Sequence, residues 1–174
     1  VFNPATDKNL VANYTLKTVA KRAENKKALC ELMGFNYSPD RPLMVLISRL
    51  TEQKGIDLVA TVLDEMLQAD IQLVVLGKGD WKYETILKNA EKTYNTKMRA
   101  IINFSQELAS KLYGAADMFL MPSKFEPCGL GQMIAMRYGA VPIVRETGGL
   151  KDTVEAFNPF TQKGNGFTFK SYQA

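Results

Sequence analysis

Short apolar runs alternate along this chain with segments whose apolar residues recur every three or four positions. Continuous runs of five or six apolar residues indicate strands buried on both faces, and the longer spacing indicates amphipathic helices. The predicted strands are 43–48, 71–76, 99–104, 117–121 and 140–144, with a further short strand at 167–169. The predicted helices are 22–33, 56–67, one starting at 81, 105–113 and 129–138.

Strands that alternate with helices in this way predict a parallel sheet with helices on both faces. We therefore expect one doubly wound, Rossmann-like α/β domain over residues 21–174. Residues 1–20 carry neither pattern, and we expect an irregular linker there. The chain has 174 residues, enough for one domain with a substantial core.

Ligands of doubly wound folds bind at the carboxyl ends of the strands. Every unusual segment of this sequence follows a predicted strand. These segments are 48–55, 77–80, 103–105, 122–131 and 145–149. Their position predicts one ligand-binding edge, and no single motif has to carry that prediction.

Two cations, Arg49 and Lys54, lie in the short loop after the first predicted strand. Arginine offers a planar fork of donors and lysine a compact charge, so the pair suits a diphosphate. The alternative is two solvated loop cations, which charge spacing alone favours. Because Arg49 directly follows a buried strand, the sequence points it toward the ligand edge.

A single carboxylate, Glu126, lies in a proline-bounded loop after the fourth predicted strand. It suits a role in holding sugar hydroxyls or offsetting positive charge at a reacting carbon, and a plain surface carboxylate is an equally good interpretation. The backbone amides of Cys128, Gly129, Leu130 and Gly131 come at the start of the next helix, a position that binds phosphate and other anions. The Cys128 thiol has no base nearby in sequence, so we expect a small buried side chain rather than a nucleophile.

Three further features have both a functional and a structural interpretation. Phe104 offers a flat ring to a base, but an aromatic residue in the core is commoner. Residues 77–79 and 148–149 allow close approach to a ligand or simply form tight turns. In the helix predicted at 129–138, helical spacing places a row of side chains along one side, namely Leu130, Met133, Ile134 and Arg137.

Composition removes several classes of function. The sequence contains 0 histidines, which excludes Ser-His and Cys-His catalysis and histidine-ligated metals within this chain. Its two cysteines are too few for a structural zinc site, and we expect free thiols. The net charge of +4 is spread among 18 acidic residues, so we expect no nucleic-acid surface. No apolar run is long enough for a membrane span or a signal peptide, and a chain that starts at Val1 is expected to be a piece of a longer protein.

Several segments resemble the glycogen and starch synthases that use ADP-glucose. The resemblance runs from Asn3 to near Phe169 and is carried by 48–58, 115–117, 122–130, 135–139 and 145–154. Residues 126–130 together with 147–154 are specific to that family. The Arg-Leu-x-x-x-Lys-Gly element at 49–55 is shared more widely among retaining glycosyltransferases.

The resemblance implies a GT-B architecture of two Rossmann-like domains, of which this chain is the C-terminal, donor-binding one. The N-terminal acceptor domain is absent from the sequence. In the family, residues that match Arg49 and Lys54 neutralise the donor diphosphate, and the match to Glu126 lies beside the donor glucose. Amides of the turn that matches 128–130 contact that sugar, and an aromatic residue that matches Phe104 packs on adenine.

The implied reaction transfers glucose from ADP-glucose to the non-reducing end of an α-1,4-glucan with retention, and it implies no metal or other cofactor. We expect the parent enzyme in the cytoplasm of a bacterium or the plastid of a plant. Two departures accompany the resemblance: Gly131 stands where Thr or Ser is frequent, and Ile134 stands where related retaining transferases carry a second Glu.

We expect the isolated chain to bind ADP or ADP-glucose weakly and not to polymerise glucan. Two other functions remain open at this point. One is a domain of a related retaining transferase that uses a UDP- or GDP-sugar. The other is a nucleotide-sugar binding module without catalysis.

Overall fold

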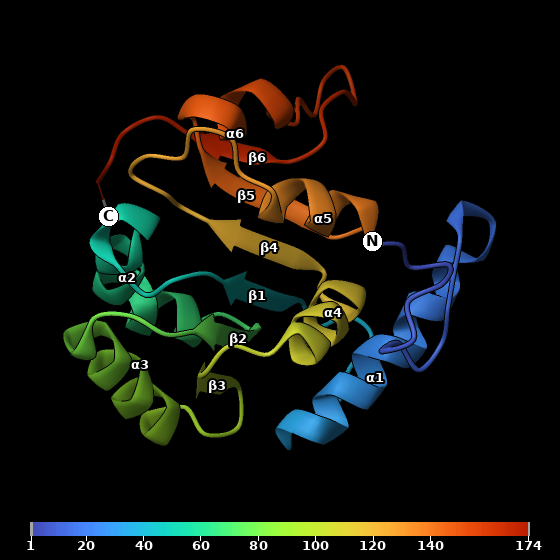
Figure 1. Cartoon of the computed structure of the whole chain (residues 1–174), viewed down its shortest axis with the longest axis horizontal. Helices are drawn as coiled ribbons and strands as arrows, with labels where there is room; N and C mark the ends of the chain where they lie inside the picture. Colours follow the sequence, from blue (N-terminus) through green and yellow to red (C-terminus); the bar gives the residue numbers. More distant parts are fainter. Residues whose placement is uncertain (1, 174) are drawn as a thin grey trace.

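The computed structural model describes residues 2–173, which form a parallel sheet of six strands in the order β3-β2-β1-β4-β5-β6 (Figure 1). The strands are β1 (Leu43–Ile47), β2 (Gln72–Gly77), β3 (Met98–Ile102), β4 (Met118–Met121), β5 (Val141–Arg145) and β6 (Phe167–Phe169). The helices are α1 (Arg22–Met33), α2 (Ile56–Gln68), α3 (Trp81–Thr93), α4 (Gln106–Ala115), α5 (Gly131–Arg137) and α6 (Gly148–Thr153), with 3-10 turns η1 (Leu16–Lys21) and η2 (Glu52–Lys54). The predicted doubly wound α/β fold is confirmed.

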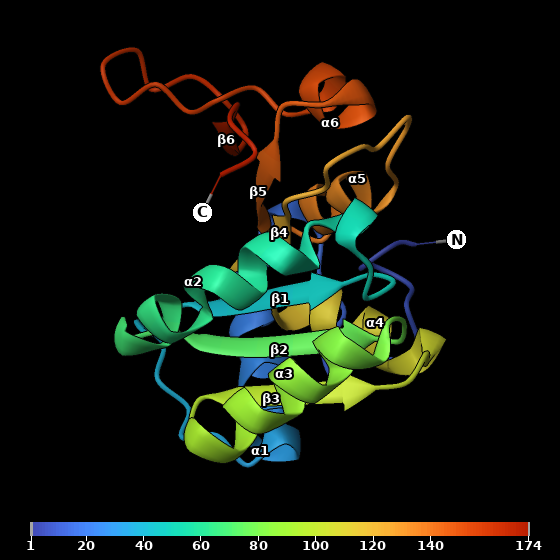
Figure 2. The same cartoon turned by 90° about the vertical axis from the view of Figure 1, so that its left-hand side faces the viewer.

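Both faces of the sheet are covered, as the continuous apolar strands require. Side chains of a strand alternate between the two faces, so Leu43 and Val45 of β1 join one core cluster with α1 and α4. Met44 and Leu46 join a second cluster with α2 and α3. Figures 1 and 2 show these helix pairs on opposite faces of the sheet.

The direction of winding reverses between β1 and β4. β1 pairs in parallel with β2 on one side and with β4 on the other, although β2 and β4 are far apart in the sequence. This arrangement places the loops that follow β1 and β4 side by side. Such a switch point is where open α/β sheets bind their ligands.

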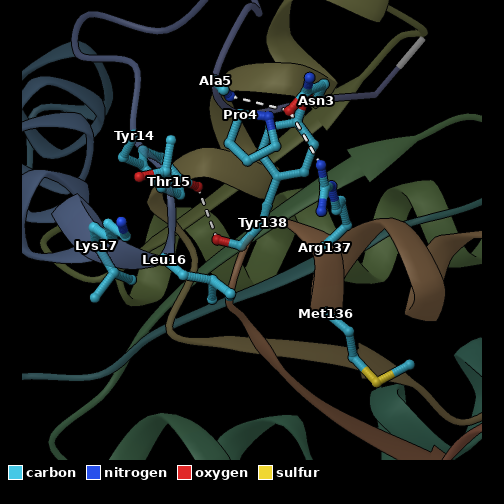
Figure 3. A pocket seen from close by; sticks show the side chains of 12 residues that line it. Asn3, Pro4, Ala5, Tyr14, Thr15, Leu16, Lys17, Met136, Arg137 and Tyr138 are labelled. Carbon is cyan, nitrogen blue, oxygen red and sulfur yellow. Dashed lines mark hydrogen bonds between the residues drawn. The ribbon is translucent and has the colours of Figure 1, made fainter.

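The first residues of the chain are irregular, as expected, but they pack against the domain. Leu10 and Tyr14 are buried in the cluster that contains α1 and α4. The Tyr14 hydroxyl donates to the carbonyl oxygen of Tyr138 at 2.7 Å, and the Tyr138 hydroxyl donates to Asp7 at 2.6 Å. Figure 3 shows the hydrogen bond between Tyr14 and Tyr138 at a pocket of about 580 Å³ between the N-terminal segment and the end of α5. Apolar burial and two long-range hydrogen bonds therefore join the segment to the domain.

Two elements differ from the sequence prediction. The glycine pair at 148–149, interpreted as a turn or a close approach, begins the short helix α6, whose Leu150 packs with Val144 of β5. α5 begins at Gly131 rather than at residue 129, because Gly129 has a left-handed backbone with φ of 70°. Among residues 2–173, no helix is long and apolar enough to cross a membrane.

Candidate functional site

The loops after β1 and β4 pack directly on each other at the switch point. The Lys124 amide donates to the carbonyl oxygen of Gln53 at 3.0 Å. Gly55 lies so close to Pro122 that a Cβ on Gly55 would come within 2.1 Å of the Pro122 carbonyl oxygen. The glycine is therefore needed for these two loops to meet.

Lys54 and Glu126 form an ion pair across the two loops, with 2.5 Å between the ammonium nitrogen and Glu126 Oε2. Their side chains are only 16% and 11% exposed, and the buried Ser123 hydroxyl donates to the same carboxylate oxygen at 3.2 Å. Neither residue is a solvated surface charge, so the structure rules out that alternative for both. Tertiary packing places a lysine and a carboxylate, 72 positions apart in sequence, in one partly buried contact.

Arg49 follows β1 in the same loop as Lys54 and is exposed. Within residues 2–173, its side chain makes no hydrogen bond or ion pair. Its neighbour Leu50 accepts from the Asp80 amide at 2.8 Å and donates to Lys78 at 3.0 Å. The segment 77–79 is thus not a turn. It runs alongside the loop after β1 and leaves the Arg49 guanidinium free on the edge of the sheet.

A third loop supports Glu126 from the other side. The Gly149 amide donates to the carbonyl oxygens of Glu126 and Pro127, both at 3.1 Å. A Cβ on Gly149 would lie 1.8 Å from the carbonyl oxygen of Cys128. The glycine pair therefore lets the loop after β5 pack on the backbone of the Glu126 loop. The carboxylate itself is held by Lys54 and Ser123, from the loops after β1 and β4.

The turn that leads into α5 leaves its amides free. Within the described residues, the amides of Cys128, Gly129 and Leu130 donate no hydrogen bond. The carbonyls of Cys128 and Gly129 accept from Gln132 Nε2 at 3.4 and 3.1 Å, and the same amide contacts Thr153 Oγ1 at 3.1 Å. Gln132 thereby ties the carbonyl side of the turn to α5 and orients it.

Sequence reasoning did not single out Gln132, which lies on the buried side of α5. Gln132 and Ala135 are buried, while Leu130, Met133 and Arg137 are exposed. Of the row Leu130, Met133, Ile134 and Arg137, only Ile134 packs against the large core cluster.

Two single-residue expectations are also corrected. Cys128 is exposed rather than buried, because it lies in the turn before α5, while Cys30 is the buried cysteine. Phe104 is 75% exposed, so the interpretation as a core aromatic is wrong. Gly131 lies against the core instead, where an added Cβ would come 3.1 Å from the Phe119 ring.

The predicted residues do not all meet at one point. Phe104 follows the outer strand β3, and β2 and β1 lie between it and the Glu126 loop after β4. Three strand spacings correspond to roughly 14 Å. The candidates therefore form a row along the edge: Phe104, then Arg49 and Lys54, then Glu126 and the turn at 128–131.

A polar cluster flanks this row at η2. Lys124 forms an ion pair with Glu52 at 2.8 Å, and the Tyr172 hydroxyl donates to Asp57 at 2.5 Å. Burial and the hydrogen bond to Asp57 raise the pKa of Tyr172. This phenol therefore stays protonated at neutral pH and holds the C-terminal segment against the start of α2.

Two pockets lie away from this row. One of about 660 Å³ lies between α2 and β6, and the one in Figure 3 is at the N-terminal segment. Neither contains Arg49, Lys54, Phe104 or Glu126. The row of candidates therefore lies outside both of these pockets.

Comparison with known proteins places this edge in a family. The sequence profile described as "Glycosyl transferases group 1" matches residues 34–174. The chain belongs to this glycosyltransferase family. It is 53% identical over its full length to a glycogen synthase of Clostridium acetobutylicum and 50% identical to one of Anoxybacillus flavithermus. In each case the chain spans only 36% of the relative's length.

Solved structures of glycosyltransferases share the fold. The catalytic domain of starch synthase IV from Arabidopsis thaliana, bound to ADP and acarbose, superposes with a TM-score of 0.90 at 37% identity, covering 99% of this chain and 36% of that one. The C-terminal domain of a group 1 glycosyl transferase from Francisella tularensis matches with a TM-score of 0.62 at 18% identity, over 99% of this chain and 79% of that one, which supports the fold alone. The predicted resemblance to glycogen and starch synthases is confirmed, and the group 1 glycosyltransferase domain corresponds to a segment of longer enzymes.

Proposed function

We propose that this domain binds the nucleotide-sugar donor of a glycogen synthase. The donor is ADP-glucose, and the parent enzyme transfers its glucose to the non-reducing end of an α-1,4-glucan with retention. The observation that carries the proposal is the row of candidates along the switch-point edge, with the Lys54–Glu126 contact at its centre.

The order of the row matches the order of groups in a nucleotide sugar. Phe104 at one end offers an exposed ring to adenine. Arg49 and Lys54, after the central strand β1, lie where an extended donor has its diphosphate. Glu126 and the free amides of 128–130 lie at the other end, where the glucose has hydroxyls to bind.

The two cations suit the chemistry of the transfer. As the bond between the anomeric carbon and the diphosphate breaks, negative charge grows on the leaving diphosphate. A guanidinium and an ammonium placed beside the diphosphate stabilise that charge more in the transition state than in the ground state. Each is worth on the order of 3 kcal/mol of barrier. The proposed reaction therefore uses side-chain cations and no resident cofactor.

Lys54 is already neutralised by Glu126 in the structure, so the donor diphosphate has to compete with the carboxylate for the ammonium. Glu126 is then released toward the glucose. Because the diphosphate must displace an existing partner, we expect the isolated chain to bind ADP weakly. We also expect it not to polymerise glucan without the acceptor-binding part of the parent, whose compartment would be the bacterial cytoplasm or the plant plastid.

Calorimetric titration of the chain with ADP and UDP tests the proposal. We expect ADP to bind more tightly than UDP, and we expect Lys54→Met and Arg49→Met each to weaken ADP binding by about tenfold or more. Lys17→Met is the matched control, because it removes an equal charge from an exposed position on η1. Equal binding of ADP and UDP would contradict the donor, and indifference to both cation variants would contradict the diphosphate site.

A further inference from the structure

The segment between α6 and β6 extends away from the body of the domain and carries three partly exposed aromatic rings. We call residues 155–167 the aromatic loop; Figure 2 shows it in red, projecting past β6. Phe160 at its tip is 95% exposed, and Phe157 and Phe167 are also exposed. The rings of Phe157 and Phe167 pack edge to face with centroids 6.2 Å apart.

The loop is held by its own hydrogen bonds. Asn158 Oδ1 accepts from the amides of Phe160 and Thr161 at 2.9 and 3.2 Å. The Asn158 amide donates to the Lys163 carbonyl at 2.7 Å, and the Gln162 amide donates back to Asn158 at 2.9 Å. Gln162 has a left-handed backbone with φ of 57°, a conformation that a non-glycine residue adopts at an energetic cost. The fold thus fixes the backbone around an apolar ring that it leaves in water.

The chemistry of the loop suits a neutral sugar chain. An exposed group of aromatic rings marks an interaction site more often than isolated apolar residues do. Aromatic faces pack on the C–H faces of pyranose rings, and amide and hydroxyl side chains bond sugar hydroxyls. Asn158 Oδ1 and Gln162 Nε2 already bond within the loop, but the Thr161 hydroxyl and the Asn158 side-chain NH₂ group make no hydrogen bond within residues 2–173 and can serve that purpose. Its two charges, Glu155 and Lys163, are opposite in sign, so it offers no net attraction to a polyanion.

The loop is separate from the donor edge. It enters β6 at the amino end of that strand, and β6 is the outer strand farthest from β3 and Phe104. The donor residues lie at the carboxyl ends of β1, β3 and β4. A small donor cannot span both places, whereas a polymer chain can contact a surface remote from the bond that is being made.

We propose that the aromatic loop is a second α-glucan binding site, which holds the polymer through Phe160 away from the donor edge. This inference rests on the proposed function only in taking the acceptor polymer as its ligand. It adds a glucan contact to the donor domain itself, where the sequence resemblance places the glucan in the N-terminal domain.

Affinity electrophoresis in native gels that contain glycogen tests the site. We expect glycogen to retard the chain, and we expect Phe160→Ala to weaken the apparent affinity at least about fivefold while Phe160→Trp retains it. Leu16→Ala is the matched control, since Leu16 is 96% exposed and lies on η1, outside the loop. Thermal melts of the variants should coincide, because neither side chain is part of the core.

Three results would overturn the site. Glycogen could retard the wild type and Phe160→Ala equally, Leu16→Ala could lose as much glycogen affinity as Phe160→Ala, or the chain could self-associate in a way that Phe160→Ala abolishes. The last would make the loop a contact between copies. Titration with ADP keeps the two proposals apart. If Phe160→Ala loses glycogen retardation but still binds ADP in a Lys54-dependent way, the loop site is supported. If the wild type does not bind ADP, the donor function is contradicted whatever the gels show.

Discussion

Removing either partner of the Lys54–Glu126 ion pair should destabilise the domain, and removing both should cost less than the sum of the two losses. The reason is burial. Glu126→Gln leaves an ammonium that is 16% exposed without a counter-charge, and Lys54→Met leaves a carboxylate that is 11% exposed with only Ser123 to hold it. In the double variant neither charge is left unpaired.

The magnitude follows from the geometry. At 2.5 Å and an effective dielectric constant of about 20, two unit charges attract by about 7 kcal/mol. Loss of hydration, at several kcal/mol for each ion, cancels most of this attraction. We expect each single variant to lose about 3 kcal/mol and the coupling energy of the pair to be about 2 kcal/mol.

Urea unfolding of the wild type, both single variants and the double variant measures the coupling. The chain offers a matched control in Lys124 and Glu52, which bridge the same two loops at 2.8 Å but are 52% and 53% exposed. For that pair, a second cycle with Lys124→Met and Glu52→Gln should give a coupling below about 0.5 kcal/mol. Equal coupling energies in the two cycles, or additive losses in the first, would refute the argument from burial.

Three further predictions concern the support of the site and the core. Gly149→Ala should lower the free energy of unfolding by about 3 kcal/mol, since its Cβ would lie 1.8 Å from a backbone carbonyl oxygen. Gly34→Ala should lower it by only about 1 kcal/mol, because its cost is a left-handed backbone with φ of 68°. Equal chemical denaturation midpoints for the two variants would contradict this. Ser105→Ala should cost about 1 kcal/mol of stability by removing the hydrogen bond that caps α4. Asp80→Ala should cost much less, because Asp80 occupies the N-cap position of α3 but its side chain makes no capping hydrogen bond, and thermal melts compare the two variants. Burial raises the pKa of Tyr113 to about 12, so above pH 10 this tyrosine ionises first in the unfolded state, and stability falls as pH rises by up to about 1.4 kcal/mol per pH unit. Tyr113→Phe should therefore flatten the fall in urea midpoints between pH 9 and pH 11. An unchanged slope would show that other groups cause the fall.

Local chemistry specified most of the fold. Apolar runs and helical spacing located the five main strands and the longer helices, because the apolar or polar character of each residue decides which face of its strand or helix is buried. Where a short helix depends on distant partners, as α6 depends on Val144, local pattern did not predict it.

The candidate site divides along the same line. Sequence marked Arg49, Lys54, Phe104 and Glu126 because unusual residues follow each strand, and it identified the family through the motifs at 126–130 and 147–154. It left open whether Lys54 and Glu126 were solvated, it assigned Cys128 wrongly, and it did not identify Gln132. The exposure of a loop residue depends on what packs over it, and a local pattern does not contain that information.

By itself, the sequence determined the parallel sheet, its helices and the set of residues at the strand ends. Only the tertiary structure decided the strand order β3-β2-β1-β4-β5-β6, and with it the row in which those residues lie. The partly buried ion pair, the orienting role of Gln132 and the packing of the N-terminal segment also appeared only there. The physical reason is that secondary structure follows from neighbours in the chain, whereas the switch point brings together loops 72 residues apart through a sheet order that no local pattern records.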